Sequence, residues 1–304
     1  MQFIRSSSNG RTSEMFQFES MAEVAVFSNP EKFQSREKGF VGEDLPTWDK
    51  VLDRTVRVWA EGMYTVQQYV DKLRAEKLPE LKDSKRKTTF NSEEGDEMDP
   101  ERLRNGEAFW KKTEREDKRG PIPVTIVVDT TTPYHTNSND ILWRGAAALA
   151  LALLLEEKGY QTEIWVINGS QLYAGESTPV MTSCCLKRCG DPIDVSTLSN
   201  VVAGWFYRTV TFTTLKTICE KRGKMVSDGL GSCYYPVASD LDHLSKDRNR
   251  VYMSGVFSFD GALSAILGEV TKLAEDAKNH EATTKTSSEE DGNDACEDDF
   301  GEGV

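Results

Sequence analysis

The stretch Pro121-Ile122-Pro123-Val124-Thr125-Ile126-Val127-Val128-Asp129 decides the fold class of this 304-residue chain. It is a run of β-branched and apolar residues that ends on a carboxylate. An apolar run without polar alternation is typical of a strand buried on both faces, as in a parallel sheet. The sequence therefore predicts a buried central strand over residues 122–128.

A strand–helix–strand order follows. After a polar loop over 130–140, residues 141–158 are apolar almost all round and end at Gly159, which favours a buried helix with a glycine cap. Residues 161–167 then form a second β-branched run. This order predicts a βαβ unit with parallel strands.

Weaker signals continue the alternation downstream. They are a strand over 179–186, a helix over 196–203 begun by Asp194, a helix over 206–219, a strand over 251–256 and a helix over 262–277. We therefore expect an α/β domain over residues 121–277, with a doubly wound, mostly parallel sheet of the Rossmann kind.

The rest of the chain divides by composition. Residues 1–15 are rich in small polar residues and are expected to be disordered. Residues 16–120 are expected to form a helical elaboration followed by a charged connector that starts near residue 75. The acidic stretch 278–304 lacks the apolar residues that a core needs and is expected to be disordered.

Two local signals stand out in the region before residue 121. Thr47 is predicted to cap a helix that runs past Trp59 and stops at Gly62. In the connector, Asp99-Pro100 marks a turn, and Leu103, Phe109 and Trp110 are expected to hold the segment against the surface.

Charge argues against a nucleic-acid partner. The chain has 50 acidic and 37 basic side chains, for a net charge of −13. Residues 281–304 alone carry nine acidic residues and one lysine, so the other 280 residues carry about −5. A domain that binds by neutralising phosphates would show a basic excess instead.

The sequence also points to a cytoplasmic protein without a membrane span. The first ten residues hold no apolar stretch of the kind a secretory signal needs. The longest apolar segment, 145–155, is short of the roughly 20 residues that cross a bilayer. Six irregularly spaced cysteines fit free thiols in a reducing compartment, and their one cluster, at 184, 185 and 189, lacks the second pair of a zinc site.

The loop after the central strand is the first place to expect chemistry, because ligands bind beyond the carboxyl ends of parallel strands. It reads Asp129-Thr130-Thr131-Thr132-Pro133-Tyr134-His135-Thr136. Asp129 and Thr131 could ligate Mg²⁺ through oxygen. Alternatively, the carboxylate and hydroxyls only satisfy backbone groups of the turn. The sequence leaves both interpretations open.

Three motifs make a resemblance specific. They are Asp129-x-Thr131 after the strand, Trp143-Arg144-Gly145-Ala146-Ala147 in the helix and Gly159-Tyr160-Gln161-Thr162-Glu163-Ile164-Trp165 after it. With them the chain resembles the first half of a von Willebrand factor A-like (VWA-like) domain. More narrowly, it is similar to an uncharacterised VWA-like family from bacteriophage and prophage genomes. Further stretches support the narrower match: Phe40-Val41-Gly42, Trp59-Ala60-Glu61-Gly62, residues 99–106, residues 191–194 and residues 207–212.

The resemblance implies a degenerate metal site. The wider fold often carries an adhesion site in which an Asp-x-Ser-x-Ser loop, a later Thr and a further Asp hold Mg²⁺ for a partner's carboxylate. Asp129 and Thr131 match the first two positions, but Pro133 has no side-chain oxygen at the third. Thr197 and Asp260 lie where the later ligands would be expected. The narrower family implies no established activity.

Two further residues and one segment each have two possible interpretations. His135 is either a general base or a solvated loop histidine. Arg208, among aromatic residues, is either an anion clamp or a stem packed on rings with its head in water. The glycine-hinged aromatic segment 229–236 is expected to cover the apical edge of the sheet or to be a plain surface connection.

Familiar enzyme motifs are absent from the sequence. There is no Gly-x-Ser-x-Gly elbow and no GxGxxG or GxxxxGK[ST] loop, and the second carboxylate of a haloacid-dehalogenase pattern is replaced by Thr131.

The favoured hypothesis is therefore a non-enzymatic module of phage origin that binds a protein partner through its apical face. The residues expected to take part are Asp129, Thr131, Thr132, His135 and Arg208. One alternative is a metal-assisted hydrolase that uses Asp129. Another, which rests on the resemblance alone, is a phage assembly or host-takeover factor in the host cytoplasm.

Overall fold

A computed structural model of the chain describes residues 1–8, 11–76, 86–91, 93–95, 97–115, 122–227, 230–244 and 249–273. The side chains of residues 8, 86–89 and 113–115 are not included in that description. The predictions for the acidic tail (278–304) and for the end of the last helix (274–277) lie outside the described residues.

The body of the protein is built on one mixed sheet in the order β1-β2-β8-β7-β6-β10. Its strands are β1 (Gln2–Ser8), β2 (Arg11–Phe18), β6 (Pro123–Asp129), β7 (Gln161–Gln171), β8 (Val180–Lys187) and β10 (Arg250–Met253), with the short β9 (Ser232–Cys233) paired to β7. β6 runs parallel to β7 and β10, and β2 runs parallel to β8, whereas the pairs β7–β8 and β1–β2 are antiparallel. The sheet is thus mostly parallel and compatible with a doubly wound α/β fold.

The predicted βαβ unit is confirmed as β6, helix α6 (Ser138–Glu157) and β7. Gly159 follows α6 with a φ of +87°, a conformation in which glycine is favoured. α6 is buried almost all round because it packs on the sheet and also against α4 and α7. It is the one helix in the described part of the chain long and apolar enough to cross a membrane, and 72% of its most apolar window is buried inside the protein.

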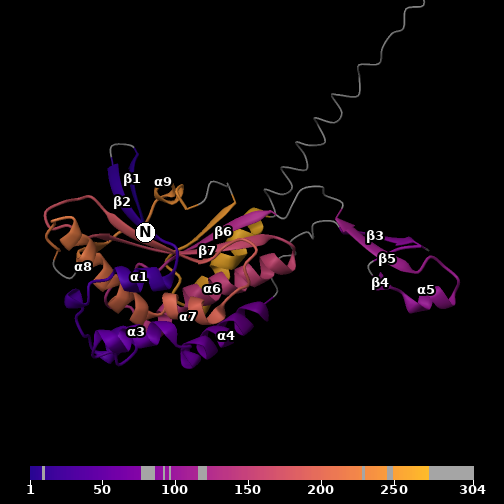
Figure 1. Cartoon of the computed structure of the whole chain (residues 1–304), viewed down its shortest axis with the longest axis horizontal. Helices are drawn as coiled ribbons and strands as arrows, with labels where there is room; N and C mark the ends of the chain where they lie inside the picture. The colour runs from indigo at the N-terminus through magenta and orange to yellow at the C-terminus, as the bar shows by residue number, and fades with distance from the viewer. Residues whose placement is uncertain are drawn as a thin grey trace, which may run out of the picture.

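The two faces of the sheet are covered unequally. Two clusters of buried apolar side chains lie on the two faces of the sheet. The larger cluster packs one face against nearly all the long helices, and the smaller cluster packs the other face against α9 and the residues after it. Figure 1 shows α3, α4, α6 and α7 on one side and α9 on the other. The helices of the larger layer are α1 (Met21–Phe27), α3 (Trp48–Val56), α4 (Ala60–Arg74), α6, α7 (Val195–Val202), α8 (Phe212–Lys221) and the helix over 259–273, with α2 (Lys38–Val41) and the 3₁₀ turn η1 (Pro30–Lys32) between them; α9 (Ala238–Leu241) lies on the other face.

The N-terminus differs from the sequence prediction. Residues 1–15 were expected to be disordered, but residues 2–8 form β1 and residues 11–15 form most of β2, which lies beside β8 in the sheet. Met15, Phe16 and Phe18 are buried there. Local composition could not show this because the hydrogen bonds of β2 come from a strand far along the chain. The segments before and after residue 121 therefore share one core.

The helix predicted around Trp59 is in fact two helices. Thr47 caps α3 as predicted, its hydroxyl accepting a hydrogen bond from the Lys50 amide. The prediction that Gly62 ends this helix was wrong, because α3 ends at Val56 and Gly62 lies within α4. A Cβ atom at Gly62 would lie 2.0 Å from a ring carbon of Trp59, so the glycine is required for this packing.

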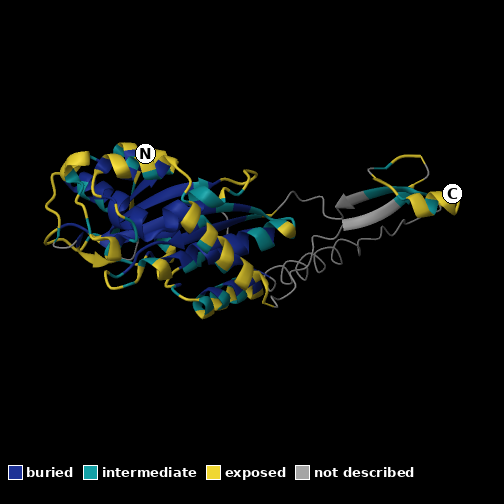
Figure 2. Ribbon diagram, turned by 90° about the horizontal axis from the view of Figure 1, so that it is seen from below, coloured by how far each residue is buried: buried dark blue, intermediate teal, exposed yellow. Residues whose placement is uncertain are grey.

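The charged connector contains a small sheet of its own. It consists of β3 (Arg86–Asn91), β5 (Trp110–Arg115) and β4 (Glu97–Met98), with the short helix α5 (Pro100–Arg104). Asp99 caps α5 at the predicted turn. The small sheet stands away from the body in both views, and none of its described side chains is buried (Figures 1 and 2). The prediction of a segment held against the surface of the body was wrong.

Candidate functional site

The apical loop, residues 129–136, begins with a carboxylate that is wholly buried (0% exposed). One oxygen of Asp129 accepts a hydrogen bond from the Thr131 amide at 2.8 Å, and the other accepts one from the Tyr252 hydroxyl at 2.7 Å. The Thr131 hydroxyl in turn accepts from the Gly169 amide at 2.9 Å. The polar groups of this turn therefore satisfy one another, which was one of the two interpretations left open by the sequence.

Arg144, on the second turn of α6, holds the loop from inside. Its guanidinium is fully buried and donates to the carbonyl oxygens of Asp129 and Thr131 and, at 2.8 Å, to the Thr132 hydroxyl. The ring of Phe257 lies 4.6 Å from the guanidinium carbon. The Arg144 guanidinium thus binds three oxygens of the apical loop, and these hydrogen bonds fix the backbone of the loop.

Arg208 holds the second half of the loop. It lies in the π-helical segment η2 (Phe206–Thr211), which continues into α8, so the helix predicted over 206–219 is confirmed with a wider first turn. Arg208 donates to the carbonyls of Pro133 at 3.1 Å and Thr136 at 2.8 Å, and it also donates to Phe40 in α2. The sequence alternative that placed the head of Arg208 in water was wrong, because the side chain is 1% exposed.

Burial dominates the electrostatics of this cluster. Burial raises the pKa of Asp129 above its ordinary value, although the hydrogen bonds of Thr131 and Tyr252 and the charge of Arg144 favour the ionised form. Burial also lowers the pKa of Arg144, which the negative charge of Asp129 opposes. The pKa values of Tyr207 and Tyr252 are raised well above the ordinary value, first by burial. Both hydroxyls are therefore neutral at physiological pH, and that of Tyr252 donates to Asp129.

A strap, residues 230–237, lies beside the apical end of β7. Its strand β9 pairs with the end of β7, beyond the point where β6 stops, and the Tyr234 amide donates to the Gly169 carbonyl at 3.1 Å. A Cβ atom at Gly169 would lie 2.4 Å from the Tyr234 carbonyl oxygen, so only glycine allows this approach. Within the described residues, this segment lies beside the apical end of β7, and the expectation that it covers the apical edge stays a prediction. Cys233 on the strap is exposed as a residue, but partial desolvation of its thiol and then the charge of Asp129 raise its pKa, which keeps it a thiol.

The outer surface of the apical loop carries two aromatic side chains. Tyr134 is 82% exposed, and His135, also exposed, meets it edge to face with ring centres 5.7 Å apart. Among the residues expected to bind a partner, His135 alone lies at the surface, whereas Asp129, Thr131, Thr132 and Arg208 are buried. These four shape the loop from within and do not present themselves to a partner.

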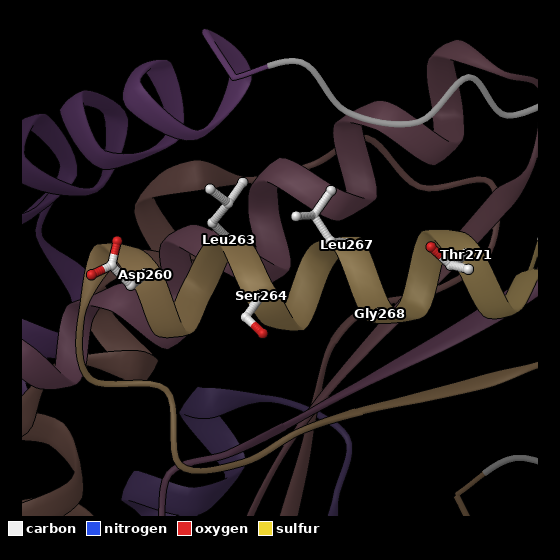
Figure 3. Close-up of a pocket in the computed structure, with 6 residues that line it drawn as sticks. All are labelled: Asp260, Leu263, Ser264, Leu267, Gly268 and Thr271. Atoms are coloured by element: carbon white, nitrogen blue, oxygen red, sulfur yellow. The ribbon is translucent and has the colours of Figure 1, made fainter.

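The donors predicted for Mg²⁺ do not fit a metal site. Both oxygens of Asp129 already accept hydrogen bonds, and the Thr197 hydroxyl donates to the Asp194 carboxylate at 2.6 Å on α7. Asp260 is exposed at the start of the helix 259–273, where it lines a shallow hollow of ≈ 520 Å³ (Figure 3). No three His, Cys, Asp or Glu side chains in the described ranges are grouped as metal ligands. The magnesium assignment gains no support.

That hollow offers few groups for chemistry. The residues drawn in Figure 3 lie along the one helix and offer a single titratable side chain; they are Asp260, Leu263, Ser264, Leu267, Gly268 and Thr271. The apical loop, with its buried ion cluster and exposed aromatic pair, is the better candidate site.

Sequence reasoning missed three residues of the apical cluster. Arg144 appeared only inside a motif, although an arginine in an otherwise apolar helix is itself a signal of a buried, partnered charge. Tyr252 and Tyr207 lie far from Asp129 in the chain and gave no local signal. Only the pairing of β10 with β6 brings Tyr252 to the Asp129 carboxylate.

Comparison with known proteins identifies the family but no activity. No curated protein and no solved structure matches the sequence. One family model, described as a domain of unknown function (DUF7192), matches residues 9–276. Because this match spans most of the chain, the protein belongs to the DUF7192 family.

Proposed function

We propose that this protein is a non-enzymatic interaction module that binds a protein partner through its apical face, with Tyr134 and His135 as the contact residues. The observation that carries the proposal is an exposed aromatic pair on a loop whose carbonyl oxygens are bound by two buried arginines. Exposed aromatic side chains are common anchors of protein interfaces. A loop that is already ordered loses little conformational entropy on binding.

The alternative, a metal-assisted hydrolase that uses Asp129, has less support. A nucleophile or metal ligand needs a free oxygen within reach of the substrate. The Asp129 carboxylate is 0% exposed, and its two oxygens accept hydrogen bonds. Substrate would have to displace these contacts before any reaction.

We also propose that the fold is VWA-like. The support is the sheet order, in which β6 lies between β7 and β10 and the next strand, β8, is antiparallel, together with Asp129-x-Thr131 at the end of β6. A phage origin and a role in assembly or host takeover are supported by the sequence resemblance alone. A cytoplasmic location is supported by the free cysteines.

Affinity capture from the source cell tests the binding proposal. The full chain is immobilised as wild type, as the double variant Tyr134→Ser/His135→Ser, and as Tyr64→Ser, a matched control because Tyr64 is 66% exposed on α4. We expect at least one protein to be retained equally by wild type and control, with or without a chelator, and about tenfold less by the double variant.

Two outcomes would count against the proposal. Equal retention by the double variant would remove the apical pair from the interface. Turnover of a phosphoester or peptide panel that is lost in Asp129→Asn would show the protein to be an enzyme.

A further inference from the structure

Two guanidinium groups lie over two phenyl rings next to the apical loop, and a lysine follows one of the rings by one helical turn. The guanidinium carbon of Arg36 lies 5.6 Å from the centre of the Phe40 ring and 5.3 Å from that of Phe212. The guanidinium carbon of Arg208 lies 4.2 Å from the same Phe40 ring. Lys216 lies one helical turn after Phe212 on α8, on the same side of the helix. Arg36 and Lys216 are both half-buried.

Arg36 and Lys216 have no counter-ion among the described residues. Within the residues that the structure describes, neither side chain forms an ion pair or a hydrogen bond to a carboxylate. Glu220, one turn beyond Lys216, pairs instead with Lys32 at 2.9 Å and accepts from Asn29 at 3.0 Å. Burial lowers the pKa of Lys216, and repulsion from the charge of Arg36 lowers it further.

Such an arrangement is unfavourable unless something neutralises it. Half-burying two like charges side by side opposes folding, and the aromatic rings offset only part of this effect. Structures that keep such groups together often do so at a binding site. A guanidinium offers two parallel N–H donors to an oxyanion, and an ammonium adds a third.

We propose that Arg36 and Lys216, with the charge of Arg208 behind them, form an anion-binding site that takes a carboxylate or a phosphate group. Arg208 also holds the carbonyls of Pro133 and Thr136, so the site lies against the loop that carries Tyr134. The site goes beyond the proposed function and does not depend on it, because it needs no contact with Tyr134 or His135.

Thermal unfolding of the full chain tests the site. Melting temperatures are measured at constant ionic strength in chloride, in inorganic phosphate and in a triglutamate peptide, for wild type, Arg36→Gln, Lys216→Gln and Lys221→Gln. Lys221 is a matched control because it lies on the same helix and over a ring, that of Phe27, at 3.8 Å. At about ten times the Kd of a bound anion, the wild-type Tm should rise by about 2–4 °C.

We expect Lys221→Gln to keep this rise and Arg36→Gln and Lys216→Gln to lose most of it. In chloride alone, Lys216→Gln should melt at or above the wild-type temperature, because the substitution removes a repulsion. A larger rise with phosphate identifies a phosphate ligand, and a larger rise with the peptide identifies a carboxylate ligand; either supports the site.

Three results would overturn the proposal. The first is a wild-type Tm that neither anion raises. The second is a rise that is equal in all three variants. The third is a Lys216→Gln protein that melts below wild type in chloride, which would make Lys216 a structural residue only.

Discussion

The apical loop and the small sheet both use an arginine to organise a polar stretch of chain, and they differ in burial. Arg144 is 0% exposed and binds three loop oxygens. Arg102 makes a similar number of contacts, to the Ala108 carbonyl at 3.0 Å, to Glu107 at 3.0 Å and to the Phe90 ring at 3.9 Å, but its side chain is 36% exposed. The same contacts contribute more to the stability of the fold when water cannot replace them.

The largest expected effect comes from removing each arginine. Arg144→Met removes the donor of two buried carbonyls and of the Thr132 hydroxyl, and it leaves the buried Asp129 carboxylate without its cation. We expect a loss of about 3–5 kcal/mol in the free energy of unfolding, measured by urea denaturation. Arg102→Met should lose less than about 1 kcal/mol, because water can solvate its partners. Equal losses would show that burial does not separate the two regions.

Substituting one glycine near the apical loop and one in the small sheet should show the same difference between the two regions, with smaller losses of stability. Gly169→Ala forces a methyl group to within 2.4 Å of the Tyr234 carbonyl, where β7 and the strap are both held. We expect a loss of about 2 kcal/mol from this overpacking. Gly106→Ala, after α5, meets nothing within 4 Å and suffers only from its φ of +69°, a penalty of about 1 kcal/mol. The same urea series measures both, and a larger loss at Gly106 would contradict the prediction.

The smallest effect concerns pH at Asp129. Burial raises the pKa of this carboxyl in the folded protein. Above the ordinary aspartate pKa of about 3.9, the unfolded chain ionises first, so ionisation opposes folding as the pH rises through the folded-state pKa. Asp129→Asn removes this effect and keeps both hydrogen bonds possible, because an amide can accept from Thr131 and donate to the Tyr252 oxygen.

The free energy of unfolding of wild type should therefore fall relative to that of Asp129→Asn as the pH rises from about 4. The other carboxyl groups titrate in both proteins and cancel in the difference. Curves that run parallel across this range would mean that the pKa of Asp129 is not raised. A wild type that gains stability relative to the variant would mean that it is lowered.

Much of the main fold could be predicted because its signals are local. Continuous β-branched runs gave β6 and β7, all-round apolarity gave α6, and the caps Thr47 and Asp194 correctly marked the starts of α3 and α7. The N-terminal hairpin could not be predicted in this way. Its first residues are polar, and β2 is stabilised by pairing with β8 and by buried Met15 and Phe16.

Parallel-sheet topology predicts a site at the loop after β6, and this stays a prediction. The contacts within that loop could not be predicted. The sequence could not show that Asp129 would be buried, that Tyr252 would take one of its oxygens, or that Arg208 would turn inward to the loop carbonyls. Each of these depends on residues from separate strands and helices, whose spacing in the chain carries no such information.

The sequence by itself determined a mixed α/β protein with a central buried strand that ends on Asp129, because periodicity and capping act within a few residues. Tertiary structure alone decided what that end of the strand can do. Two arginines from α6 and η2 converge on the loop and bind its oxygens, which leaves the carboxylate inside and the pair Tyr134 and His135 outside. The physical reason is that a buried charge must find partners, and only the folded chain brings these partners together.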